Sequence, residues 1–132
     1  MGHEFSCRVY YEDTDMAGIV YYANYLKFIE RARSDWVRGL GLDQARMRKE
    51  GSVFAVRRVE ADYLKPARFD DELQVRTAVR SVSAARIVLR QEVWRGGDLL
   101  FGAVVTLVCL EAGGRAARLP AILRTMGQTA EK

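Results

Sequence analysis

The chain has 132 residues, of which 49% are hydrophobic and 29% charged, the composition of an ordinary globular protein. We expect one domain over residues 1–132, because this length leaves no room for a second. The formal net charge of +4 is too small to indicate a nucleic-acid-binding face. The longest apolar run, Leu99 to Leu110, is too short to span a membrane, so we expect a cytoplasmic protein.

The first elements predicted are a short strand and an ordered loop. Ser6 to Tyr11 is rich in strand-forming residues, and Val9 and Tyr11 would share one face of that strand. Residues 12–18 then combine carboxylates, a threonine and a glycine, which favour turns.

Two helices are predicted next. From Tyr22 onward, apolar residues recur at intervals of three and four, which predicts a long helix ending near Gly39 or Gly41. Leu42 to Glu50 predicts a shorter helix with Asp43 as its N-cap.

The rest of the chain predicts strands. After Gly51 the hydrophobic period changes to two, and one strand is expected to extend to Tyr63, with Arg57 as an anomaly on its apolar face. That face is expected to hold Val53, Ala55, Val59, Ala61 and Tyr63. Pro66 marks a break. The further strands expected are Glu72 to Val82, Arg86 to Trp94 and Leu99 to Leu110.

These elements predict an α+β fold in which a mainly antiparallel five-stranded sheet wraps one long helix. A short helix from Pro120 to Met126 would close the domain.

Carboxylates are the main candidates for catalysis. The only histidine is His3 near the N-terminus, and no nucleotide-binding glycine motif occurs. Glu12, Asp13 and Asp15 lie just before the long helix, whose N-terminal N–H groups attract anionic oxygens. They fit an acyl-transfer site, but judged from the carboxylates alone the favoured interpretation is that Asp13 and Asp15 cap the helix and order the loop.

Three segments carry a family resemblance. Residues 10–25 read YYEDTDMAGIVYYANY, residues 30–33 read ERAR, and residues 63–71 read YLKPARFDD. The first closely resembles the signature of hotdog-fold acyl-CoA thioesterases of the 4-hydroxybenzoyl-CoA thioesterase type. With the other two, the chain is most similar to the Tol-Pal-associated acyl-CoA thioesterases. The resemblance runs from Arg8 to about Pro120 and implies a single hotdog domain.

The resemblance implies roles for individual residues. Asp15 matches the family's catalytic aspartate, as nucleophile or general base, and Asp13 becomes a loop-ordering neighbour. Tyr22 matches the residue whose backbone N–H stabilises the oxyanion, although several relatives have histidine there. Gly18, Tyr21 and Tyr25 are then candidates for substrate binding.

The phosphates of coenzyme A would need cations. Arg57 and Arg58, and on a later strand Arg86 and Arg90, are candidates by charge alone, with Arg57 favoured because it interrupts an apolar face. Solvated surface arginines are an equally good interpretation. No metal or separate cofactor is implied, because coenzyme A is part of the substrate.

The resemblance also implies partners. The expected substrate is an acyl-CoA, and the alternatives are an acyl group on acyl carrier protein or a non-catalytic acyl-CoA-binding role. Family members are homodimers or homotetramers with sites at the dimer seam, so Asp15 would face groups from a second subunit.

Overall fold

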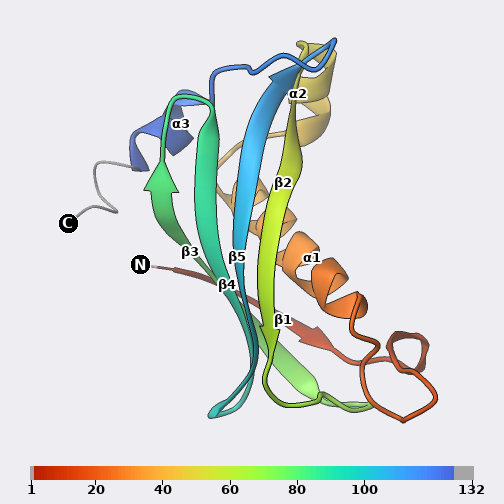
Figure 1. Ribbon diagram of the computed structural model, residues 1–132. Helices are drawn as coiled ribbons and strands as arrows, with labels where there is room; N and C mark the ends of the chain where they lie inside the picture. The colour runs from red at the N-terminus through yellow and green to blue at the C-terminus, as the bar shows by residue number, and fades with distance from the viewer. Residues whose placement is uncertain (1, 127–132) are drawn as a thin grey trace.

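The computed structural model describes residues 2–126 and contains one five-stranded sheet with a long helix along one face (Figure 1). Every strand pairing is antiparallel, and the strand order is β1-β3-β4-β5-β2. The strands are β1 (His3–Arg8), β2 (Ser52–Tyr63), β3 (Glu72–Val82), β4 (Arg86–Arg95) and β5 (Asp98–Glu111). The helices are the 3-10 turn η1 (Tyr11–Asp13), α1 (Asn24–Gly39), α2 (Gln44–Lys49) and α3 (Ala121–Arg124). The predicted α+β architecture is confirmed.

The helix α1 supplies the centre of the core. Its inward face consists of Tyr25, Phe28, Ile29, Ala32, Trp36 and Val37, all buried. A polar contact also joins α1 to the sheet, because the buried Gln91 amide donates hydrogen bonds to the Ile29 carbonyl (3.0 Å) and to Thr77 Oγ1 (2.8 Å). The predicted start at Tyr22 is wrong by two residues, because Tyr22 lies in the turn that precedes the helix and is 62% exposed.

The predicted signals at the C-terminal end of α1 and at the N-terminal end of α2 are confirmed. The helix α1 ends at Gly39, and Gly41 adopts a positive φ of 87°, which costs glycine little. Asp43 caps α2 by accepting hydrogen bonds from the N–H groups of Ala45 (3.0 Å) and Arg46 (3.2 Å).

The first strand lies earlier in the chain than predicted. It ends at Arg8, and Tyr11 lies in the turn η1, where it is 83% exposed, whereas Val9 is buried. The expectation that Val9 and Tyr11 share one strand face is therefore wrong. Asp13 causes the difference, because its carboxylate accepts a hydrogen bond from the Tyr10 N–H (2.8 Å) and holds the chain in a turn.

A β-bulge in β2 explains the anomalous Arg57. The register between β2 and β5 shifts between Val56 and Arg58, which leaves Arg57 as the extra residue. Phe54 pairs with the buried Cys109 before the bulge, and Ala61 pairs with the buried Ala103 after it. The inward face thus changes from even to odd residue numbers, so the prediction that Val53 and Ala55 share a face with Tyr63 is wrong.

The strand β2 is an edge of the sheet, paired only with β5 in the described part of the chain. It carries several exposed apolar side chains, namely Val53, Val56, Val59 and Tyr63. No helix among residues 2–126 combines the length and apolar character that crossing a membrane requires.

Candidate active site

The loop before α1 and the connection between β2 and β3 meet at one end of the sheet (Figure 1). Isolated bridge pairing joins Ile19 to Arg68, and the Val20 N–H donates to the Ala67 carbonyl at 2.8 Å. The buried Tyr25 hydroxyl accepts the Ala67 N–H at 3.1 Å, which fixes the same connection to α1. Two segments far apart in sequence therefore form one wall.

Asp15 lies in the loop with one carboxylate oxygen occupied. Its Oδ1 accepts hydrogen bonds from the N–H groups of Ala17 (2.9 Å) and Ile19 (3.4 Å). Within residues 2–126 its Oδ2 accepts no hydrogen bond, and the side chain is only partly buried. One oxygen therefore holds the carboxylate in place while the other is open to a ligand or to water.

Asp13 has a different environment from Asp15, although only one residue separates them. It is 4% exposed, and its two oxygens accept hydrogen bonds from the Tyr10 N–H and the Asn24 Nδ2, both at 2.8 Å. The Tyr21 N–H also donates to the Asp13 carbonyl at 2.8 Å. Asp13 thus joins the loop to the first residue of α1, and it is buried and does not line the pocket described below.

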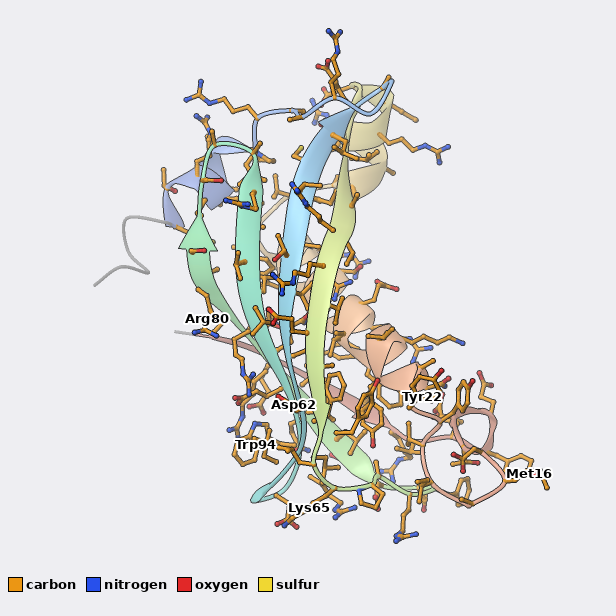
Figure 2. All side chains as sticks on the ribbon, viewed as in Figure 1. Met16, Tyr22, Asp62, Lys65, Arg80 and Trp94 are labelled. Carbon is orange, nitrogen blue, oxygen red and sulfur yellow. The ribbon has the colours of Figure 1, made fainter. Side chains whose placement is uncertain are left out.

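The N-terminus of α1 offers a backbone donor beside this loop. The Tyr21 carbonyl accepts the Asn24 N–H at 2.8 Å, which fixes the peptide that carries the Tyr22 N–H. In the described part of the chain the Tyr22 N–H donates no hydrogen bond. Figure 2 shows Tyr22 where the loop meets α1 and Met16 at the outer tip of the loop. An incoming oxygen can therefore accept from the Tyr22 N–H.

A pocket of about 370 Å³ brings these groups together. Its lining comprises Asp15, Ile19, Val20, Tyr21, Tyr22, Tyr25, Tyr63, Leu64, Lys65 and Pro66. A carboxylate, the start of α1 and four tyrosine rings thus share one concave surface. This combination of an apolar wall with a few polar groups is typical of a small-molecule site.

The candidates named from the sequence fall into two groups. Asp15, Tyr21, Tyr22 and Tyr25 line the pocket. Gly18 does not line it but shapes the loop, since its φ of 79° favours glycine and its N–H donates to the Asp15 carbonyl at 3.0 Å.

The arginine candidates lie elsewhere. Arg57 and Arg58 are exposed around the β2 bulge and do not line the pocket. Arg58 pairs with Glu60 at 3.4 Å. On β4, Arg90 pairs with Glu92 at 3.2 Å, and neither it nor Arg86 lines the pocket.

Sequence reasoning assigned no role to two polar residues of the pocket, Tyr63 and Lys65. The Lys65 ammonium lies 3.2 Å from the Asp98 carboxylate, with both side chains about half exposed. The Tyr63 hydroxyl donates to the Tyr22 carbonyl at 3.0 Å. Both residues belong to the motif of residues 63–71, and this was the one signal in the sequence that they belong to the site. Their contacts with Tyr22 and Asp98 join residues distant in sequence, so no local pattern predicts them.

Neither cysteine offers an alternative nucleophile. Burial raises the pKa of the Cys7 thiol to about 11, despite the opposing charge of Arg31, and this thiol does not line the pocket. Cys109 is fully buried, and burial raises its pKa as well. Because the thiolate is the reactive form, both side chains are inert at neutral pH.

Asp71 stabilises the segment that forms the pocket wall. Its Oδ2 accepts hydrogen bonds from the Arg68 N–H and from Arg95 Nη1, both at 2.8 Å, and Arg95 also donates to the Pro66 carbonyl at 3.2 Å. Burial alone would raise the pKa of Asp71, but these hydrogen bonds and the Arg95 charge hold it below its ordinary value of 3.8.

A depressed pKa makes stability depend on pH in the acid range. Well above the ordinary pKa of 3.8, Asp71 is ionised in both the folded and the unfolded state and its full contribution to stability is present. This contribution disappears as pH falls through the folded-state pKa. The difference in unfolding free energy between wild type and Asp71→Asn should therefore shrink below about pH 4. Urea unfolding of both proteins from about pH 6 to 2.5 measures this difference in free energy. A difference that stays constant over this range would contradict the stabilising role of the Asp71 carboxylate.

Comparison with known proteins identifies the family. The thioesterase superfamily matches residues 17–102. The acyl-CoA thioesterase YbgC of Haemophilus influenzae is 41% identical over 113 residues, which cover 85% of this chain and 83% of that protein. The acyl-CoA thioester hydrolase YbgC of Escherichia coli O157:H7 is 38% identical over 105 residues, 79% of this chain and 78% of that protein.

Solved structures agree on the fold. A probable thioesterase from Bartonella henselae superposes with a TM-score of 0.88 and 33% identity, covering 91% of this chain and all of that one. The 1,4-dihydroxy-2-naphthoyl-CoA thioesterase Slr0204 from Synechocystis has a TM-score of 0.89, covering 100% of this chain and 99% of its own, and at 24% identity it supports the fold alone. The hotdog fold implied by the sequence resemblance is confirmed, and the chain belongs to the thioesterase superfamily.

Proposed function

We propose that this protein hydrolyses the thioester bond of an acyl-CoA to give a free acid and coenzyme A. The observation that carries the proposal is the pocket that Asp15 and the start of α1 line together, with only the Oδ1 of Asp15 engaged by hydrogen bonds in the described part of the chain. The names of the YbgC relatives, acyl-CoA thioesterase and acyl-CoA thioester hydrolase, support the substrate class.

The proposed reaction uses two groups of the pocket. Asp15 either accepts a proton from water while that water attacks the thioester carbonyl, or attacks the carbonyl itself and forms a mixed anhydride that water then cleaves. In both routes the carbonyl oxygen gains negative charge, which the Tyr22 N–H would stabilise. The C–S bond breaks as this negatively charged intermediate collapses, which in the second route is the step that forms the anhydride. The coenzyme A thiolate leaves and takes up a proton, from Asp15 in the first route and from solvent in the second.

A thiol-release assay tests the proposal. The purified protein is incubated with acyl-CoAs of different chain length, with an aromatic acyl-CoA and with acylated acyl carrier protein, and free thiol is measured with a thiol reagent. Release from acyl-CoAs supports the proposal. Release from acylated acyl carrier protein alone would show that the substrate is the carrier protein and not an acyl-CoA. Binding of acyl-CoA without thiol release would indicate a non-catalytic module.

We further propose that the protein acts as a homodimer or homotetramer. The support is the edge strand β2, whose outer hydrogen-bonding groups are unpaired within residues 2–126 and whose exposed side chains include Val53, Val56 and Val59. Such an edge pairs readily with another strand. Arg57 and Arg58 lie on this strand and do not line the pocket of this chain, so in an oligomer formed through β2 their candidate role is at the site of a neighbouring subunit.

The mass of the active species tests this assembly. Light scattering during gel filtration should give two or four times the mass of one chain, and thiol release should follow the same peak. Full activity in a peak with the mass of one chain would contradict the assembly. It would also remove both arginines as candidate ligands for the coenzyme A phosphates.

A further inference from the structure

The tyrosine at the end of β2 makes a contact that no catalytic role yet explains. The Tyr63 hydroxyl crosses from the sheet to the start of α1 and donates a hydrogen bond to the Tyr22 carbonyl at 3.0 Å. The two residues are 41 positions apart in sequence. Figure 2 shows Tyr22 next to the end of α1 that faces this part of the sheet.

The ring of Tyr63 is held by other aromatic side chains. Its centroid lies 5.1 Å from Phe101, 5.5 Å from Tyr25 and 6.3 Å from Tyr22, and all three pairs meet edge to face. Tyr25 and Phe101 are buried and stack on each other at 4.9 Å. Because this packing fixes the ring, the position of the hydroxyl is fixed as well.

The hydroxyl remains a donor at physiological pH. Burial raises the pKa of Tyr63, and the neighbouring Tyr22 raises it further, so the phenol stays protonated. A protonated phenol can donate to a carbonyl, whereas a phenolate cannot.

The contact completes the support of Tyr22. The peptide before it is fixed by the hydrogen bond from the Asn24 N–H to the Tyr21 carbonyl at 2.8 Å. The peptide after it is fixed by Tyr63. With both neighbouring peptides held, the direction of the Tyr22 N–H is set before a substrate arrives, and pre-orientation of this kind makes an oxyanion donor effective.

We infer that Tyr63 is a positioning residue that aims the Tyr22 N–H at the oxyanion through its hydrogen bond to the Tyr22 carbonyl. This inference rests on the proposed thioesterase function. Tyr63 transfers no proton in this role, and its effect is exerted through the backbone.

The Tyr63→Phe variant tests the inference because it keeps the ring and removes only the hydroxyl. The donor itself remains, so we expect kcat for acyl-CoA hydrolysis to fall by roughly tenfold, less than the loss of a whole oxyanion donor. KM should stay within about twofold of wild type, because the interaction acts mainly on the transition state. Tyr11→Phe, which removes a hydroxyl from an exposed ring outside the pocket, should leave both constants unchanged.

A spectroscopic measurement makes the test independent of turnover. In 15N-labelled protein, the amide signals of Tyr22 and Ala23 should shift in Tyr63→Phe, because Ala23 N–H belongs to the peptide whose carbonyl loses its donor. They should not shift in Tyr11→Phe. Unmoved signals, a kcat within twofold of wild type, or a rise in KM alone would each overturn the inference.

The two proposals fail in different ways. If wild-type protein releases no thiol from any acyl-CoA, the proposed function fails, and the amide signals still report whether Tyr63 holds Tyr22. If wild type is active and Tyr63→Phe is equally active, the thioesterase proposal stands and the positioning role is lost.

Discussion

Replacing Asp15 with asparagine is expected to lower kcat for acyl-CoA hydrolysis by about 10³-fold or more while the fold is retained. Asparagine has no charge with which to attack the thioester or take a proton from water. Its side-chain oxygen can still accept the hydrogen bonds that Ala17 and Ile19 donate to Asp15 Oδ1. Thiol release measures turnover, thermal unfolding measures the fold, and calorimetry with coenzyme A measures ligand affinity.

The matched control is Asp62→Asn, the same chemical change at an exposed carboxylate of β2 that does not line the pocket. Its turnover should equal that of wild type. Near-normal turnover of Asp15→Asn would remove Asp15 from the mechanism. Loss of folding in that variant would instead contradict the hydrogen-bond pattern described for its loop.

The second large effect concerns stability and falls on Asp13. The Asp13→Ala variant should lose about 2–4 kcal/mol of unfolding free energy, because it leaves the buried Asn24 Nδ2 and the part-buried Tyr10 N–H without a partner. For a domain of this size the melting temperature would fall by roughly 6–20 °C. Urea unfolding gives the free energy, and a thermal scan gives the midpoint.

Glu12→Ala provides the control, because Glu12 lies in the same turn and is exposed. Its unfolding free energy should change by no more than about 0.5 kcal/mol. Equal stability of Asp13→Ala and Glu12→Ala would show that the Asp13 hydrogen bonds add nothing. Together, the variants at positions 13 and 15 separate the carboxylate that stabilises the loop from the one assigned to catalysis.

Local signals predicted much of the fold. The strand β3 has the predicted bounds, and Asp43 caps α2 as expected. Alternation, capping residues and turn glycines act within a few residues, so the sequence alone reveals them.

The errors arose where distant contacts decide the conformation. Tyr11 continues an alternating pattern, but the hydrogen bonds of Asp13 to Tyr10 and Asn24 turn the chain away from the sheet. The bulge in β2 was visible only as the anomaly at Arg57, because a pattern of period two does not show where a residue is left unpaired.

The candidate site was predictable in part. The family resemblance led to Asp15 and Tyr22, and both line the pocket. The contact between Tyr63 and Tyr22 depends on the end of β2 lying beside the start of α1, which no local rule predicts. Charge alone identified Arg57 and Arg58, and neither lines the pocket.

The bulge also determines how insertions and deletions would affect this protein. Because Arg57 is the unpaired residue, a chain lacking it could continue β2 as a regular strand, with Phe54 and Tyr63 both still directed inward. A single deletion between the bulge and Tyr63 would instead move that ring to the outer face. Alignments of homologues should therefore tolerate a one-residue gap at this position and disfavour one closer to the pocket.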